Sequence, residues 1–341
     1  MILNKSIGLD IGLKTIKAVA LSRQKDSFVL DAFGFLPTPP KGMVSEAPID
    51  EQEMAQALKK TVENLKVNSR TVNIALSDNQ VYTKVIEMPV LSDKELASAI
   101  YWEAERYIPV ALPSISLVWN VLKRPSNSSE KMQVLMVGAP TILVNKYQKV
   151  LQMAGLNLNS IETETLVIVR ALVTPQLPPT IIVNIGEVST SLAIIKNGIL
   201  VLTYSIPTGG NAINRSIEVD FGLTPTQSEE YKKTYGFSRQ GAGQKIGKST
   251  EPILTSILLE IKKALAFYSQ KYKDDSIIQQ ILLSGGTAKL PGIDLFFAEN
   301  LGIETVVANP WKMLAGQKVP PEILNGTLDF TIALGLAMKG L

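Results

Sequence analysis

The stretch Ile7-Gly8-Leu9-Asp10-Ile11-Gly12 sets a pattern that returns in the middle of the chain as Ile181-Ile182-Val183-Asn184-Ile185-Gly186. Each copy is an apolar run with one polar side chain just before the closing glycine. A second β-rich run follows each glycine, over residues 15–19 and 189–195. A buried strand, a glycine turn and a second strand together predict a β-hairpin in both places.

Each hairpin is followed by a further predicted strand, over residues 28–36 in the first half and 199–206 in the second. The dipeptide Asn197-Gly198, just before the later strand, is a strong signal for a tight turn. Helical patterns come later in both halves. This self-similarity within one chain predicts two related α/β lobes.

Composition limits the function classes. The 341 residues include 34 Lys and Arg against 31 Asp and Glu, so the net charge is +3. The length suits roughly two domains, and the charge is too small to predict nucleic-acid binding. The chain has no cysteine and no histidine, which excludes disulfides, thiolate metal sites and Ser-His-Asp triads. Catalysis would therefore need carboxylates, lysines, hydroxyls, backbone dipoles or a bound ion.

No apolar run reaches the ~18 uncharged residues that a membrane-spanning helix needs. The N-terminal residues also lack the layout of a signal peptide, because Asp10 interrupts their apolar stretch. We therefore expect a soluble cytoplasmic protein that does not insert into a membrane.

A different block separates the two lobes. Ser92 and Glu95 form a predicted capping box at the start of a helix that stops before Pro109. Strands and a second helix follow, giving the order β-α-β-β-α-β, which is typical of a small ferredoxin-like module. We predict a first lobe over 1–83, completed by 165–180 and 318–341, an inserted module over 84–164, and a second lobe over 181–317. The polar, glycine-rich segment 238–249 is predicted to be a loop.

Three motifs of the lobes carry candidate chemistry. The first is Asp10-x-Gly12-x-x-Thr15-x-Lys17, where a tight glycine turn exposes backbone N–H groups that suit phosphate oxygens. Its carboxylate could hold a water bound to Mg²⁺. The second is Asn184-x-Gly186 followed by Ser189-Thr190-Ser191, and the third is Ser284-Gly285-Gly286-Thr287 after an apolar strand. Taken singly, each motif is more often an ordinary turn.

Together, the three motifs in this order resemble the phosphate-1, phosphate-2 and adenosine motifs of the actin-like ATPase superfamily. The resemblance implies that ATP and Mg²⁺ bind between the lobes. It implies that residues of both lobes bind the phosphate groups and the metal. Those of the first lobe are Asp10, Gly12, Lys14, Thr15 and Lys17. Those of the second lobe are Gly186, Thr190 and Ser191. It assigns the nucleoside to Gly209, Gly210, Glu229, Lys232, Gly285, Gly286 and Thr287. The implied metal ligands are Asp10 and Asn184, through water.

Finer motifs resemble the PilM family of type IV pilus biogenesis proteins. They include Tyr82-x-Lys84-x-Ile86-x-Met88-Pro89, Tyr107-Ile108-Pro109 and Gly209-Gly210-Asn211-x-Ile213. The resemblance covers nearly the whole chain and implies a relation to the division protein FtsA. It implies a scaffold role in the inner-membrane platform of the pilus, at the inner face of that membrane.

The same resemblance implies a partner, the cytoplasmic N-terminal segment of PilN, which would dock in a groove beside the inserted module. We assign Met88, Leu91, Tyr107 and Pro109 to that groove, although aromatic side chains at helical spacing are more often core. The apolar C-terminal segment 328–338 is predicted to be a buried helix of the first lobe, so that membrane attachment is indirect, through PilN. Self-association and contacts with other platform proteins stay open.

Two positions depart from the superfamily pattern. Asn184 stands where the family usually has Asp, which removes one negative charge from the metal site, and Lys14 stands where a small hydroxyl residue is usual. Glu164 is the best-placed residue to orient an attacking water. Because metal charge and water activation are major terms in phosphoryl transfer, we predict ATP binding with slow hydrolysis or none. Two alternatives stay open, an active ATPase or kinase of the same fold and a filament-forming protein like FtsA.

Overall fold

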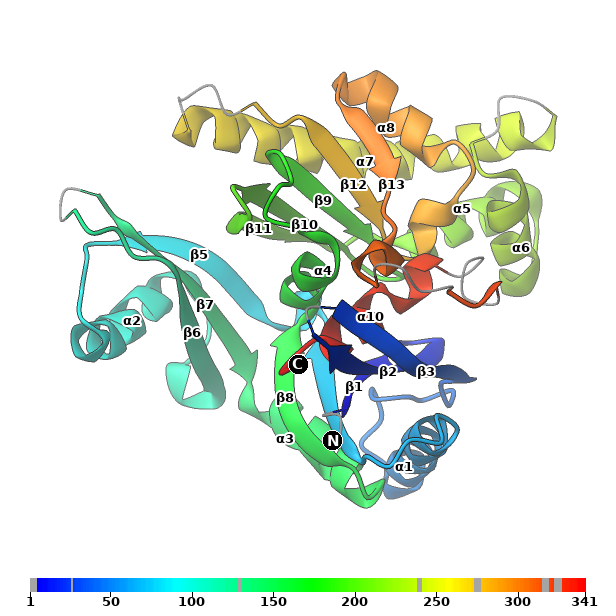
Figure 1. Cartoon of the computed structure of the whole chain (residues 1–341). Coiled ribbons are helices and arrows are strands. Elements are labelled where there is room, and N and C mark those ends of the chain that lie inside the picture. Colours follow the sequence, from blue (N-terminus) through cyan, green and yellow to red (C-terminus); the bar gives the residue numbers. More distant parts are fainter. Residues whose placement is uncertain are drawn as a thin grey trace.

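The computed structural model describes residues 5–25, 27–127, 130–237, 241–272, 277–314, 319–321 and 327–341. Its strands form three sheets (Figure 1). Two of them have five strands and follow one plan, and the third is a separate sheet of three strands.

The first sheet has the order β3 (Ser27–Pro37), β2 (Thr15–Gln24), β1 (Lys5–Ile11), β4 (Thr71–Leu76) and β8 (Asn157–Thr163). Strands β1, β2 and β3 pair antiparallel, whereas β4 and β8 continue the sheet in parallel. Helices α1 (Pro48–Glu63) and α3 (Thr141–Met153) pack on one face of this sheet, against side chains such as Leu9. The C-terminal helix α10 (Thr331–Ala337) packs on the other face, against Val19 and Leu21.

The second sheet repeats this plan with β11 (Ile199–Ile206), β10 (Thr190–Lys196), β9 (Thr180–Ile185), β12 (Gln280–Ser284) and β13 (Glu304–Val307). The first three pair antiparallel and the last two in parallel. Helices of this half are α5 (Gly210–Phe221), α6 (Pro225–Tyr235), α7 (Ala242–Lys271) and α8 (Ile293–Leu301). Both predicted hairpins and the two-lobed plan are confirmed.

The inserted module has its own sheet, β5 (Tyr82–Met88), β7 (Met132–Pro140) and β6 (Ile115–Lys123), and its own helix α2 (Asp93–Tyr107). The capping box of Ser92 and Glu95 opens α2 as predicted. Elements along the chain keep the predicted β-α-β-β-α-β order, but their strands belong to two different sheets. β8 pairs with β4, and α3 packs with α1, so the last two elements complete the first lobe. A ferredoxin-like sheet of four strands is therefore not formed.

Most of the segment 238–249, which was predicted to be a loop, is the start of helix α7. Residues 238–240 lie outside the described residues, and α7 begins at Ala242. Gly243 and Gly247 are buried in this helix, and a Cβ added at Gly247 would lie 3.5 Å from the Phe237 ring. The prediction was wrong because close packing outweighs the low helix propensity of glycine.

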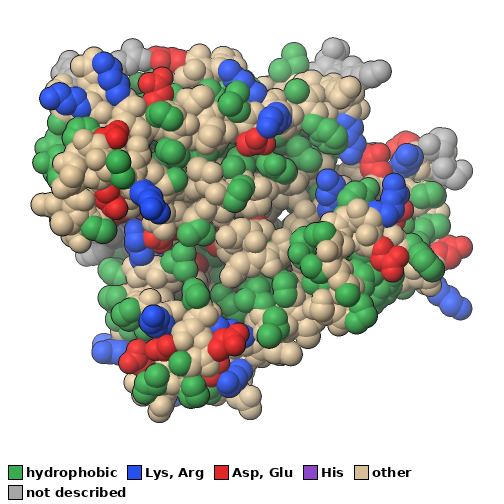
Figure 2. All heavy atoms as spheres, turned by 180° about the vertical axis from the view of Figure 1, so that it is seen from behind, with side chains coloured by type: hydrophobic (Ala, Val, Ile, Leu, Met, Phe, Trp, Pro, Cys, Tyr) green, Lys and Arg blue, Asp and Glu red, His purple; other side chains and the backbone are tan. Residues whose placement is uncertain are grey.

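Figure 1 shows α4 (Glu164–Leu172) near the centre, between the two large sheets, and the module extending to one side. The module also contacts the second lobe. Lys271 Nζ lies 2.8 Å from Glu87 Oε1, and Gln133 donates to Tyr272 Oη at 3.4 Å. Figure 2 shows positive and negative side chains interspersed over the opposite face, as a net charge of +3 leads one to expect.

Helix α10 lies in the first lobe, in the place predicted for the C-terminal segment. A Cβ added at Gly8 would lie 2.0 Å from Ala333 O, and one at Gly335 would lie 2.3 Å from Val167 O. Side chains at these two positions would push the helix off β1 and α4. The backbones approach this closely only because both positions are glycine.

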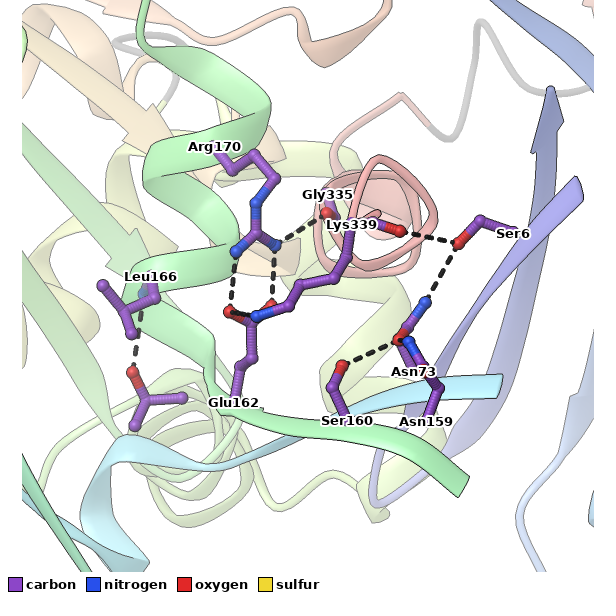
Figure 3. Close-up of polar contacts among 10 residues, drawn as sticks. Ser6, Asn73, Asn159, Ser160, Glu162, Leu166, Arg170, Gly335 and Lys339 are labelled. Atoms are coloured by element: carbon purple, nitrogen blue, oxygen red, sulfur yellow. Dashed lines mark hydrogen bonds and ion pairs between the residues drawn. The ribbon is translucent and has the colours of Figure 1, made fainter. Parts of the chain in front are cut away.

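A partly buried polar network holds the same helix in place (Figure 3). Glu162 on β8 accepts two hydrogen bonds from Arg170 on α4, both 2.7 Å, and a third of 2.7 Å from Lys339. Arg170 also donates to Gly335 O at 3.0 Å, and Ser6 donates to Lys339 O at 3.1 Å. The network thus joins the ends of the chain to the edge strand of the first sheet.

We expect Glu162→Ala to lower the free energy of unfolding by about 3 kcal/mol, because it leaves two cations without their buried partner. Urea unfolding at neutral pH measures this change. Glu63→Ala is the matched control, since Glu63 forms an exposed ion pair with Arg70 at 3.6 Å, and it should change stability by less than ~1 kcal/mol. Equal effects of the two substitutions would contradict the structural role of Glu162.

Candidate functional site

The β1–β2 hairpin carries the first group of predicted site residues at its turn. Gly12 N donates to Thr15 O at 3.2 Å, and Thr38 Oγ1 donates to Gly12 O at 2.7 Å. An added Cβ at Gly12 would lie 2.8 Å from Thr15 O, so the turn needs glycine. Asp10, at the end of β1, faces Lys17 across the hairpin, with 3.4 Å between Oδ2 and Nζ.

The β9–β10 hairpin repeats this arrangement in the second lobe. Gly186 N donates to Ser189 O at 2.9 Å, and Gly210 N, in the first turn of α5, donates to Gly186 O at 2.9 Å. A Cβ added at Gly209 would lie 2.7 Å from Gly186 O. The helix N-terminus and the hairpin turn are therefore packed backbone against backbone. Because both of these glycine N–H groups already donate to protein carbonyl groups, an anion at this helix N-terminus would bind to other N–H groups of the turn.

The third motif meets the second one. β12 runs parallel to β9, and Gly285 follows it with φ of +85°, a conformation that favours glycine. An added Cβ at Gly285 would lie 2.9 Å from Asn184 Oδ1, and one at Gly210 would lie 2.6 Å from Thr287 Oγ1. Gly286 and Thr287 belong to the short helix η3 (Gly286–Lys289). The second and third motifs thus meet in one surface, in which Gly285 and Gly210 lie against the side chains of Asn184 and Thr287.

Helix α6 adds Glu229 and Lys232 to this surface. The Glu229 carboxylate accepts from Asn214 Nδ2 at 2.6 Å and lies 3.0 Å from Lys232 Nζ and 3.2 Å from Lys233 Nζ. Burial alone would raise the pKa of Glu229, but the hydrogen bond from Asn214 and the neighbouring lysines hold that pKa well below its usual range. Glu229 is therefore a carboxylate at any ordinary pH.

Lys14 connects the two lobes. Its Nζ lies 2.8 Å from Glu187 Oε1, in the β9–β10 turn, and 3.3 Å from Glu229 Oε2 on α6. A pocket of about 880 Å³ opens beside this contact, between α5 and α6. Its lining includes Lys14, Asn211, Asn214, Arg215, Glu229 and Lys233.

Two hydroxyl groups assigned to phosphate have protein partners. Thr190 Oγ1 donates to Thr208 O at 2.7 Å, and the Ser191 side chain forms a hydrogen bond with Asp78. Both residues are buried in β10. Their contacts hold the second hairpin in place beside α5 and the first lobe.

Asp78 is a site residue that the sequence analysis missed. It begins the short helix η1 (Asp78–Gln80) after β4, where Ser77-Asp78-Asn79 is typical of an ordinary turn. Its carboxylate accepts from Thr165 Oγ1 at 2.7 Å and from Thr165 N at 3.3 Å. Burial raises the pKa of Asp78 although these hydrogen bonds lower it. No pattern within one strand predicts that Asp78 meets α4, because the two lie 87 residues apart.

Glu164, at the start of α4, lies beside Asp78 and accepts a hydrogen bond from Ser77 Oγ at 3.1 Å. Burial raises its pKa to about 8, and the negative charges of Asp78 and Asp10 add to this shift. Burial also raises the pKa of Asp10, against the effect of Lys17. Glu164 therefore holds a proton at neutral pH.

The predicted metal ligands come from both lobes, Asp10 from β1 and Asn184 from β9. Among the described residues, no group of three or more acidic side chains is arranged to hold a metal ion. Mg²⁺ usually keeps several waters and takes few protein ligands. One carboxylate and one amide suit an ion that a phosphate and water also coordinate, rather than an ion caged by protein.

The four residues assigned to the peptide groove do not share one surface. Met88 is buried in the core of the module, and Leu91 packs against that core. Tyr107, the last residue of α2, and Pro109, just after the helix, are exposed, and the Tyr107 ring centroid lies 5.5 Å from Lys84 Nζ.

Comparison with known proteins identifies the family. The profile of the type IV pilus assembly protein PilM matches residues 8–341. The chain belongs to the PilM family. A solved structure described as a PilM-PilN type IV pilus biogenesis complex contains a chain that is 27% identical to this member of the family. The two align over 98% of each chain with a TM-score of 0.84.

More distant relatives share the fold. FtsA of Enterococcus faecalis is 23% identical over 84% of this chain and 74% of its own length. MreB 5 of Spiroplasma citri, solved with AMPPNP, is 15% identical over 97% of this chain and 94% of its own, with a TM-score of 0.54. The predicted actin-like fold and the relation to FtsA are confirmed. Of the helices within the described residues, none is long and apolar enough to cross a membrane.

The raised pKa of Glu164 predicts a pH dependence of stability. An unfolded glutamate loses its proton near its ordinary pKa of 4.5, whereas the folded protein keeps it up to about 8. The folded state therefore binds more protons between these values, and stability from this group falls as pH rises, by up to ~1.4 kcal/mol per pH unit.

Urea unfolding of the wild type and of Glu164→Gln, at several pH values from about 5 to 8, measures this slope. We expect a steeper loss in the wild type, because the amide does not titrate. Glu63→Gln, on an exposed turn of α1, should keep the wild-type slope. Parallel curves for the wild type and Glu164→Gln would contradict a protonated Glu164.

Proposed function

We propose that this chain is an ATP-binding scaffold component of the type IV pilus assembly platform, bound to the cytoplasmic N-terminal segment of PilN. PilN is proposed as the partner because the chain matches a chain of the PilM-PilN complex over 98% of both chains. A scaffold of this kind would lie at the inner face of the inner membrane through PilN.

ATP is proposed from the geometry of the site. Glycines on three elements, Gly12, Gly186 and Gly285, leave backbone exposed around the meeting point of the two lobes. Two buried polar atoms there have no hydrogen-bond partner among the described residues, Asn214 Oδ1 and Ser284 Oγ. Asn214 is 6% exposed, and Lys232 is also 6% exposed. Buried polar atoms without partners are costly, so these residues fit a polar ligand such as a nucleoside with phosphate groups.

In that site, backbone N–H groups of the two hairpin turns would hold the phosphates, and Glu229 and Lys232 would bind the ribose and the base. A bound Mg²⁺ would neutralise phosphate charge. Glu164 would orient the attacking water, but a protonated carboxyl cannot accept the proton of that water. Slow hydrolysis at neutral pH follows from this protonation, and Asn184 adds to it by removing a charge from the metal site.

Isothermal titration with Mg-ATP, with and without a synthetic peptide of the PilN N-terminus, tests the function. We expect both to bind. Gly285→Ala should weaken ATP binding at least about tenfold, because its Cβ would enter the Asn184 contact. Gly222→Ala is the matched control, since its φ of +63° is also positive but nothing lies within 4 Å of the added Cβ.

Absence of ATP binding by the wild type would overturn the nucleotide part of the proposal, and absence of peptide binding would overturn the partner. If Gly285→Ala fails to fold, Lys232→Met serves in its place, with the melting temperature as the check on folding.

Phosphate release tests the slow hydrolysis. We expect the rate to rise up to about tenfold per pH unit from pH 6 towards 8, as Glu164 loses its proton. Glu164→Gln should abolish this rise, because its amide carries no titrating proton. ATP turnover on the order of 1 per second at neutral pH, lost in Asp10→Ala, would contradict slow hydrolysis and identify the protein as an active ATPase.

A further inference from the structure

One cation joins the three segments that the proposed nucleotide site uses. Lys14 belongs to the β1–β2 turn of the first lobe. Its Nζ lies 2.8 Å from the carboxylate of Glu187 in the β9–β10 turn and 3.3 Å from that of Glu229 on α6. A single side chain from one lobe therefore holds two carboxylates of the other lobe.

The backbone of Glu187 and the carboxylate of Glu229 are held by other residues of the second lobe. Asn211 N donates to Glu187 O at 2.8 Å, which ties the turn to the first residues of α5. Glu229 is held by Asn214 at 2.6 Å and by Lys232 at 3.0 Å. Both acceptors are only 24% exposed at the side chain, whereas Lys14 is 55% exposed. Lys14 is therefore the more solvent-accessible partner, and an incoming ligand can reach it more easily than it can reach the two carboxylates.

Phosphate groups would compete for this lysine. They would enter between the two glycine turns that Lys14 and Glu187 flank, and a phosphate binds an ammonium group more strongly than a carboxylate of lower charge does. Their negative charge would also repel the carboxylates of Glu187 and Glu229. The contact seen in the structure and a bound polyphosphate therefore exclude each other in part.

We propose that Lys14, Glu187 and Glu229 form an inter-lobe latch that the phosphate groups of a nucleotide release by taking over Lys14. This inference rests on the proposed nucleotide function. In the free protein the carboxylates substitute for the ligand's phosphates and hold the lobes together. The latch responds to the charge of the ligand and not to its base, so it weakens binding of ATP but not of adenosine.

Titration of Glu187→Gln tests the latch. We expect its affinity for Mg-ATP to exceed that of the wild type by about threefold to tenfold, because one competing charge is lost. Its affinity for adenosine should be unchanged. Glu260→Gln is the matched control, since Glu260 is also 24% exposed and pairs with Lys263 at 2.6 Å on α7. Equal ATP affinities of wild type and Glu187→Gln, with ATP bound by both, overturn the latch and leave the proposed function standing.

A second measurement needs no nucleotide. The chain has no native cysteine, so Asn68→Cys in the first lobe and Ser269→Cys in the second give two unique labelling sites. Pulsed electron spin resonance then reports the distance between the lobes. We expect a broader distribution for Lys14→Ala and Glu187→Gln than for the wild type, and no change for Glu260→Gln. The Lys289–Asp329 ion pair, between η3 and the segment before α10, still joins the lobes in all variants.

Unchanged distributions in Lys14→Ala and Glu187→Gln overturn the latch, whatever the titrations give. If the distance distributions broaden but no variant binds ATP, the nucleotide proposal is overturned. The ion pairs of Lys14 would then hold the lobes together, but ATP would not release them, which also overturns the proposed release of the latch. The same broadening with tighter ATP binding by Glu187→Gln supports both proposals.

Discussion

Backbone meets backbone around Gly209 and Gly285 more closely than a side chain permits, and the second lobe is arranged around these two contacts. A Cβ at Gly209 would lie 2.7 Å from Gly186 O, and one at Gly285 would lie 2.5 Å from Ile185 O. The contacts fix α5 against the β9–β10 turn and β12 against β9. Those two junctions bring glycine backbone, the buried amide of Asn214 and the buried Lys232 together at one place. The site thus depends on missing side chains as much as on the polar groups around them.

Local patterns in the sequence predicted most of this arrangement. Apolar runs that end in glycine predicted both hairpins, and Ser92 with Glu95 predicted the start of α2. Local patterns do not reveal which sheet a strand joins. β8 pairs in parallel with β4, from which it is separated by the whole module, and its sequence fits either sheet. The order of elements was therefore right, while their grouping was not.

The same limit applies to the site. The glycine motifs have a local signal, because a tight turn needs glycine in a fixed place. Asp78 has none, since its contacts with Thr165 and Ser191 come from distant parts of the chain. The protonation of Glu164 likewise follows from burial and from neighbours that only the folded chain brings together. Met88 was assigned to the peptide groove because it belongs to a family motif. The structure places it in the core of the module and not on a surface.

The module is attached to both lobes, and this restricts how the molecule can move. Its strands continue from the first lobe, whereas Glu87 and Gln133 contact the end of α7 and Tyr272 in the second. A rotation of one lobe against the other must either break these two contacts or carry the module with it. If the module moves with the first lobe, a small change of angle between the lobes would become a larger displacement at the far end of α2, which lies well to one side of both large sheets (Figure 1).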